Sequence, residues 1–232
     1  MKILIVSGFL GAGKTTFIKR LARNVDQRFA ILENEYGAAG IDGARLGQNR
    51  QGTQKNVWEM TEQCICCIGK KDFAASVLTI ANVVDPEYLI VEPTGVGSLA
   101  RIIENLRQIE YERIQLLSPV TIVDVYSYRR YMAEYPELYQ DQIRSADTII
   151  VSKTEACQAE EKQRIQKFLQ EINSQAKIIT DYASTMTRED YQSLLLGSRY
   201  EKKVQDTQSG EKMPETFSFE NIRMEAPETL WC

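Results

Sequence analysis

The sequence of 232 residues contains no histidine. This absence excludes Ser-His-Asp and Cys-His nucleophilic catalysis, because both need an imidazole to take the proton of the nucleophile. It also removes imidazole as a metal ligand, although imidazole is otherwise one of the commonest. Any metal site in this chain must therefore be built from sulfur and oxygen ligands.

Long apolar runs and clustered positive charges are also absent. No run reaches the roughly 20 residues of a membrane span. KILIVSG at residues 2–8 breaks at glycines with no small-residue cleavage site after it, so we expect no signal peptide. A net charge of -4 disfavours a nucleic-acid surface, which needs clustered Lys and Arg. We therefore expect no membrane or nucleic-acid partner, and a cytoplasmic location.

Short apolar runs alternate with stretches of helical periodicity. With 43% hydrophobic and 26% charged residues, the chain fits one main globular domain. Continuous apolar runs are typical of parallel strands covered on both faces. Strand alternating with helix predicts an α/β fold with a doubly wound, mostly parallel sheet, which binds ligands beyond the carboxyl ends of its strands. The predicted strands are residues 3–6, 30–32, 57–60, 88–91, 120–123, 148–151 and 177–179, and the predicted helices lie within residues 17–25, 74–81, 102–109 and 165–172.

GFLGAGKT at residues 8–15 matches the pattern G-x-x-x-x-G-K-[ST] between a predicted strand and a predicted helix. Glycines let backbone N–H groups wrap a phosphate, and the helix N-terminus adds its positive dipole end. We expect Lys14 to reach the β- and γ-phosphates and the Thr15 hydroxyl to bind Mg²⁺. The sequence thus predicts a P-loop. Its predicted nucleotide-binding residues are Gly8, Gly11, Ala12, Gly13, Lys14, Thr15 and Thr16.

LIVEPTG at residues 89–95 places Glu92 at the end of a predicted buried strand. A carboxylate there can hold Mg²⁺, directly or through water, or can orient the attacking water. The alternative is a helix-capping turn in which Thr94 is the important residue. Lys14 and Glu92 are therefore the candidate catalytic residues.

IIVSKTE at residues 149–155 forms another loop after a predicted strand, with Ser152, Lys153 and Glu155 as candidate nucleotide-binding residues. The Glu155 carboxylate can accept the N1–H and the N2 amino hydrogens of guanine, which adenine does not offer. The Lys153 stem can pack over the base. This loop predicts a preference for guanine nucleotides.

Three of the five cysteines fall within QCICCIGKK at residues 63–71. Thiolates suit Zn²⁺ and related ions, and a Cys-x-Cys-Cys turn can present two or three sulfurs to one centre. Three thiolates leave a fourth tetrahedral position open, which suits a carrier that must release its metal. The alternative is a set of buried free cysteines, although the polar flanks are unlike a core. The cluster consists of Cys64, Cys66 and Cys67, whereas Cys157 and Cys232 stand alone and are interpreted as structural or incidental.

These motifs together resemble the CobW-type metal-trafficking GTPases, which are relatives of the urease and hydrogenase nickel-insertion GTPases. The resemblance rests on GFLGAGKTT, NEYG followed by IDG, CICC, EPTG and SKTE, in the family's order and approximate spacing over residues 1 to about 198. It implies a SIMIBI-like P-loop GTPase domain that hydrolyses GTP to GDP slowly with Mg²⁺. It also implies Zn²⁺ or Co²⁺ on the cysteines, and raises a link to cobalamin biosynthesis.

The resemblance has further implications for ligands and partners. Glu35, in the NEYG segment, is the candidate for the fourth metal position or for a second, shared site, with water or a partner's ligand as the alternative. A metal-receiving client protein is expected, and a nucleotide-dependent homodimer is one expectation because related GTPases pair around nucleotide. The segment 36–68 follows the predicted second strand, where GTPase switches lie, so nucleotide state is expected to change how the cysteines hold metal.

The sequence also departs from the family pattern. Gln63 stands where the family usually has Gly, and Ala38 stands where a second acid is often found. Ser152 and Glu155 replace the Asn and Asp of the commoner NKxD motif. Residues 199–232, which include TFSFENIRMEAPETLW, are interpreted as a linker and the start of a C-terminal domain after a GTPase domain at 1–198, so a truncated or a naturally shortened chain is expected.

Two other functions fit parts of the sequence. A nucleotide-gated binding module would use the cysteines as a structural zinc site, whose metal would survive strong chelators in every nucleotide state. A small-molecule kinase would also carry G-x-x-G-x-G-K-T, but it would need an acceptor site and usually a lid with arginines, and it would leave CICC unexplained.

Overall fold

The structure is a computed structural model that describes residues 1–27, 29–33, 57–61, 70–197 and 200. The chain divides into two compact units, Met1–Glu201 and Lys202–Cys232. All described residues belong to the first unit. The predicted boundary between residues 198 and 199, and the predicted strand and helix at 216–231, lie outside the described residues and stay predictions.

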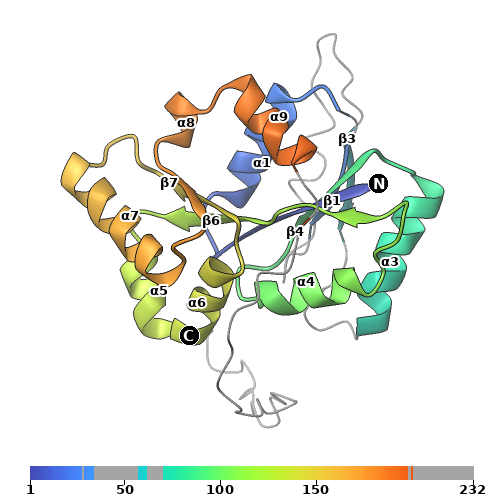
Figure 1. The fold of residues 1–232 in the computed structure, drawn as a ribbon, viewed down its shortest axis with the longest axis horizontal. Coiled ribbons are helices and arrows are strands. Elements are labelled where there is room, and N and C mark those ends of the chain that lie inside the picture. Colours follow the sequence, from blue (N-terminus) through green and yellow to red (C-terminus); the bar gives the residue numbers. More distant parts are fainter. Residues whose placement is uncertain (28, 34–56, 62–69, 198–199, 201–232) are drawn as a thin grey trace, which may run out of the picture. The chain divides into compact units, whose positions relative to one another are not determined.

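The core of the first unit is a parallel sheet in the order β3-β2-β4-β1-β6-β7-β8, with the short β5 paired to β1 (Figure 1). The central strand β1 pairs with β4 along its first half and with β6 along its second half, where Val6 lies opposite Val120. This topology confirms the predicted α/β fold and all seven predicted strands. The strands are β1 (Lys2–Gly8), β2 (Phe29–Glu33), β3 (Val57–Thr61), β4 (Tyr88–Glu92), β5 (Gln115–Leu116), β6 (Val120–Asp124), β7 (Thr148–Ser152) and β8 (Lys177–Ile179).

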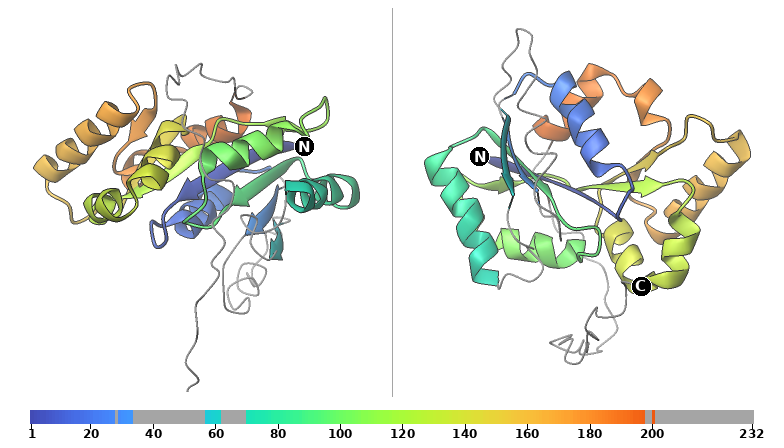
Figure 2. Two further views of the ribbon diagram at one scale, coloured as in Figure 1. Left: turned by 90° about the horizontal axis from the view of Figure 1, so that it is seen from below. Right: turned by 180° about the vertical axis from the view of Figure 1, so that it is seen from behind.

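Helices cover both faces of the sheet, as Figure 2 shows from two further sides. Leu4 and Val6 of β1 pack with Phe17 of α1 and with residues of α8 and α9 on one face. Ile3 and Ile5 pack with residues of α3 and α4 on the other face. On that same face, α5, α6 and α7 cover β6 and β7. The strands are apolar at consecutive positions because helices cover both faces of the sheet. The helices are α1 (Lys14–Asn24), α3 (Lys70–Val83), α4 (Leu99–Arg107), α5 (Tyr128–Glu134), α6 (Pro136–Arg144), α7 (Ala159–Ile172), α8 (Tyr182–Thr185) and α9 (Arg188–Leu196).

The four predicted helices are confirmed, but α5, α6, α8 and α9 were not predicted. The α5–α6 pair buries Tyr128, Tyr139, Gln142 and Ile143. Tyrosines and a glutamine do not produce an aliphatic helical stripe, so the periodicity that marks α1 is weak here. Within the part of the chain that the structure describes, no helix is both long and apolar enough to cross a lipid bilayer.

Candidate nucleotide site

The P-loop joins β1 to α1 at the centre of the sheet. Gly8, Gly11 and Gly13 have φ values of 145°, 71° and 98°, which side chains with a Cβ rarely adopt. The loop closes with a hydrogen bond from the Ala12 N–H to the Phe9 carbonyl (3.1 Å). Gly13 is the N-cap of α1, so the helix N-terminus opens directly onto this loop. The predicted phosphate cradle thus has the backbone conformation that the glycines were expected to allow.

Lys14 opens α1, and its side chain turns back over the loop. Its ammonium donates hydrogen bonds to the carbonyls of Gly8 (3.0 Å) and Phe9 (3.4 Å), and the residue is 8% exposed. A buried ammonium needs such partners, because removing it from water is costly. The cation is therefore held within the loop, where a phosphate would meet it.

Thr15 and Glu92 lie together although 77 residues separate them. The Thr15 hydroxyl lies 3.1 Å from one Glu92 carboxylate oxygen and 3.3 Å from the other. Glu92 ends β4 beside β1 and is buried. The alternative cap at Thr94 is not the arrangement found, because α4 has Ser98 as its N-cap and the Ser98 hydroxyl accepts the N–H of Arg101.

The residues after β7 divide between the P-loop and a buried acid. The Ser152 hydroxyl donates to the Ala12 carbonyl (2.6 Å), so it ties β7 to the P-loop. Lys153 has a φ of 61°, and its ammonium lies 2.7 Å from the Asp124 carboxylate. Glu155 is exposed beyond them. The structure thus places Ser152 against the P-loop itself and leaves the Glu155 side chain exposed to solvent.

Asp124, at the end of β6, was missed by the sequence reasoning. Its carboxylate accepts hydrogen bonds from the Tyr126 N–H (2.9 Å), the Ser127 hydroxyl (2.8 Å) and Lys153. Burial alone would raise the pKa of Asp124, but the hydrogen bonds and the Lys153 charge outweigh it and lower the pKa below its usual value. A carboxylate directly after the run VTIV was the available signal, since β6 is a neighbour of the P-loop strand.

We expect Asp124→Asn to reduce the acid sensitivity of this protein. The pKa of Asp124 is lower in the folded state than its unfolded value near 3.8, so the ionised carboxylate stabilises the fold at pH values above 3.8. This stabilisation is lost as the pH falls through the folded-state pKa. Urea unfolding between about pH 6 and pH 3 should show the wild-type advantage over Asp124→Asn shrinking with acid. Asp85→Asn, at an exposed ion pair with Arg113, is the control and should change stability little at any pH. A wild-type advantage that stays constant down to pH 3 would contradict this role.

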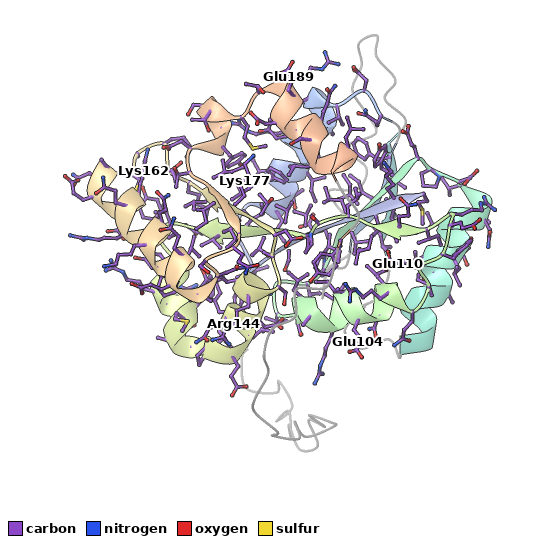
Figure 3. The ribbon with its side chains drawn as sticks, in the orientation of Figure 1. Glu104, Glu110, Arg144, Lys162, Lys177 and Glu189 are labelled. Carbon is purple, nitrogen blue, oxygen red and sulfur yellow. The ribbon has the colours of Figure 1, made fainter. Side chains whose placement is uncertain are left out.

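The loop after β8 was also missed. β8 pairs with β7, so Thr180 and Asp181, which connect β8 to α8, follow the strand next to β7. Asp181 there has a φ of 57°, and its carboxylate accepts a hydrogen bond from Lys162 of α7 (2.6 Å), whose position Figure 3 marks. This hydrogen bond lowers the pKa of Asp181. This loop follows the strand next to β7, at the edge of the sheet where the carboxyl ends of the parallel strands meet.

The predicted metal ligands Cys64, Cys66, Cys67 and Glu35 lie outside the described residues. Among the residues that are described, no group of three or more Cys, Asp or Glu side chains could hold a metal ion. Cys157 is a half-buried free thiol. The cysteine site therefore stays a prediction.

The residues around the P-loop fit a magnesium nucleotide. Three positive-φ glycines, a helix N-terminus and a buried lysine make an anion cradle. The Thr15 hydroxyl and the Glu92 carboxylate, already in contact, are the oxygen ligands that Mg²⁺ prefers, and its other positions are usually filled by water and phosphate.

A parallel α/β sheet with this cradle between β1 and α1, and a carboxylate from β4 on its threonine, defines a P-loop nucleotide-binding protein. The model of the CobW/HypB/UreG nucleotide-binding domain matches residues 2–180. The chain belongs to this family.

Two curated relatives show how much of a longer protein the match covers. The zinc chaperone YeiR of Escherichia coli (strain K12) is 30% identical over 178 residues, which are 75% of this chain and 53% of the relative. The zinc chaperone CobW of Pseudomonas aeruginosa is 27% identical over 209 residues, with 77% of this chain and 56% of the relative covered. The chain thus spans about half the length of these curated relatives.

Solved structures share the fold. The Zn(II)-bound YjiA GTPase from E. coli matches with a TM-score of 0.59 at 22% identity. The match covers 81% of this chain and 58% of the YjiA chain. The hydrogenase maturation factor HypB from Archaeoglobus fulgidus has a TM-score of 0.57 at 19% identity and covers 85% and 89% of the two chains. At these identities the similarity establishes the doubly wound P-loop fold.

Proposed function

We propose that this chain is a metal-linked GTPase that binds GTP with Mg²⁺, hydrolyses it to GDP and phosphate, and carries or inserts a transition metal. The contact between Thr15 and Glu92 is the observation that carries the nucleotide half of this proposal. It joins a carboxylate to the P-loop threonine, as nucleotide hydrolysis with Mg²⁺ requires. The relatives named zinc chaperones, together with the cysteine cluster of the sequence, support the metal half.

The residues of the nucleotide site each have a role in the proposed reaction. The P-loop N–H groups and Lys14 bind the phosphates and stabilise the charge that develops on them. The Thr15 hydroxyl and the Glu92 carboxylate hold Mg²⁺, or Glu92 orients the attacking water. Mg²⁺, when bound, supplies a Lewis acid that neutralises phosphate charge. Ser152 keeps the P-loop in place, while Lys153 and Glu155 select guanine.

Several narrower statements belong to the same proposal. Cys64, Cys66 and Cys67 bind the metal, and Glu35 or a partner supplies the fourth ligand. Zinc is the first candidate because the curated relatives are named for it, with cobalt and a cobalamin connection as the second. The partners are a client protein that receives the metal and a second copy of the chain paired around nucleotide. A reducing cytoplasm would keep the thiols free to bind metal.

We expect the metal affinity to depend on the nucleotide. The test is a Zn²⁺ and Co²⁺ titration of the reduced protein, with GDP and with a non-hydrolysable GTP analogue. The cobalt-thiolate charge-transfer band reports sulfur ligation. A nucleotide-linked site should differ roughly 5- to 150-fold in affinity between the two states, the usual range of coupling between two sites.

Three serine variants identify the ligands in this titration. Cys66→Ser and Cys67→Ser should each weaken the charge-transfer band, because one of three thiolates is lost, whereas Cys157→Ser, which changes a lone half-buried thiol outside the cluster, should leave it unchanged. An absent band would refute metal binding by the cysteines. Equal affinity in both nucleotide states would refute the switch, and metal that resists chelators in both would indicate a structural zinc site.

A further inference from the structure

The loop between β4 and α4 is held from outside by one side chain of α6. The Gln142 side-chain N–H group donates to the carbonyls of Gly95 (3.1 Å) and Gly97 (3.0 Å), and the residue is 1% exposed. Both partners can only accept, so the amide nitrogen must face the loop, because the flipped amide would set its oxygen against two carbonyl oxygens. Gln142 therefore acts on the loop as a donor of two buried hydrogen bonds.

The same loop lies directly on the P-loop backbone. A Cβ placed on Gly95 would be 2.4 Å from the Leu10 nitrogen and 2.9 Å from the Phe9 carbonyl carbon, so no side chain separates the two loops. A turn closed by a hydrogen bond from the Gly97 N–H to the Thr94 carbonyl (3.1 Å) connects this contact to α4. Gln142 binds this turn, so it holds the loop where it contacts the P-loop.

Helix α6 is itself firmly placed, which makes it a suitable support. The Asp141 carboxylate accepts the N–H groups of Leu99 (2.7 Å) and Ala100 (3.3 Å) at the start of α4, beside which α6 lies (Figure 1). The Thr121 hydroxyl of β6 donates to the Gln142 backbone carbonyl (3.0 Å). α6 thus connects β6, α4 and the loop that follows Glu92.

We infer that Gln142 is a positioning residue of the nucleotide site, which fixes the loop after β4 on the P-loop and so keeps the Glu92 carboxylate on the Thr15 hydroxyl. Glu92 lies only three residues before Gly95, so a shift of the loop displaces the carboxylate. The inference rests on the proposed function, because it assigns Gln142 a part in holding Mg²⁺ at that site.

The side-chain oxygen of Gln142, unlike its nitrogen, makes no hydrogen bond within the described part of the chain. A buried polar atom without a partner destabilises a fold, and an apolar side chain of similar size would avoid that cost. Any favourable contribution of the Gln142 amide must therefore come from its two hydrogen bonds to the Gly95 and Gly97 carbonyls.

The test compares Gln142→Met with Gln140→Met. Both change a glutamine of α6 to an apolar side chain of similar length, but Gln140 faces Met132 of α5 and not the loop. We expect Gln142→Met to raise the Mg²⁺ concentration for half-maximal GTP hydrolysis about tenfold, the lower end of the range for losing a group that orients metal ligands, because Gln142 acts on Glu92 only through the loop backbone. GDP affinity in EDTA should match that of Gln140→Met, whereas the melting temperature should be lower, because the Gly95 and Gly97 carbonyls lose their buried donor.

Hydrogen exchange adds a readout of the loop itself. The peptide covering residues 93–100 should exchange faster in Gln142→Met than in Gln140→Met, while the P-loop peptide stays protected. If Gln142→Met does not fold, Gln142→Asn replaces it; the shorter amide cannot reach both carbonyls, so a smaller shift in the same direction is expected.

The outcomes separate this inference from the proposed function. An unchanged Mg²⁺ midpoint, or one that rises only together with a loss of GDP affinity in EDTA, overturns the positioning role. A wild-type protein that binds GDP but does not hydrolyse GTP refutes the proposed GTPase. The Mg²⁺ dependence of GDP binding then still tests Gln142, because it requires no hydrolysis.

Discussion

Lys14→Met is expected to reduce the rate of GTP hydrolysis by roughly 10²- to 10³-fold, the usual effect of removing one preorganised group that stabilises transition-state charge. The Lys14 ammonium is buried and is held by the carbonyls of Gly8 and Phe9. Its position is therefore fixed before the phosphates arrive, and little reorganisation is needed when charge develops on them. Methionine fills much the same volume without a charge, so the loss should lie in the chemistry and in phosphate binding.

The measurement is single-turnover hydrolysis of GTP at saturating Mg²⁺, together with the melting temperature of the variant. Lys19→Met is the matched control, because Lys19 lies on the same helix and is half-buried outside the P-loop. It should hydrolyse GTP within about twofold of the wild type. Equal rates for Lys14→Met and the wild type would show that hydrolysis does not occur at this P-loop.

The nucleotide half of the site could be predicted because it depends on local patterns. The P-loop is contiguous in sequence, and Glu92 ends an apolar run that becomes β4 beside β1. Since the carboxyl ends of parallel strands meet at one edge of the sheet, Thr15 and Glu92 were expected near each other. Their contact across 77 residues follows from the fold class and two short motifs.

The contact of α6 with the loop after β4 could not be predicted, because no local sequence pattern indicates it. Gln142 is buried only because its partners, the carbonyls of Gly95 and Gly97, lie 47 and 45 residues earlier in the chain. Glutamine is mostly an exposed residue, and Asp141 directly before it does not indicate burial either. Long-range pairing of a side chain with loop backbone leaves no periodicity, so only the structure shows it.

Asp124 lies between these two cases. Its place at the end of β6 is visible in the sequence, but the reason for its ionisation is not. The positive φ of Lys153 lets that ammonium reach back to the carboxylate, and a turn brings the Tyr126 N–H to it. The sequence thus indicates where a functional acid can lie, whereas the backbone conformation of a neighbouring loop determines its charge.

Gly8→Ala should have the largest effect on stability, because this glycine is constrained twice. Its φ of 145° is unfavourable for a residue with a Cβ, and that Cβ would lie 2.5 Å from the Ile122 carbonyl oxygen of β6. Strain at such a φ costs of order 1–3 kcal/mol and overpacking against backbone typically another 1–3 kcal/mol, so we expect a loss of roughly 2–5 kcal/mol in the free energy of unfolding. Relief would require β1 and β6 to separate where the P-loop begins.

Gly11→Ala isolates the backbone contribution. Gly11 has a φ of 71°, but a Cβ there meets nothing within 4 Å. The expected cost is that of the left-handed conformation alone, about 1–2 kcal/mol. Urea unfolding of the two variants without nucleotide measures both losses. A Gly8→Ala loss no larger than that of Gly11→Ala would mean that β6 gives way easily. In that case the close packing of β1 on β6 would not be what holds the P-loop in the conformation that binds phosphate.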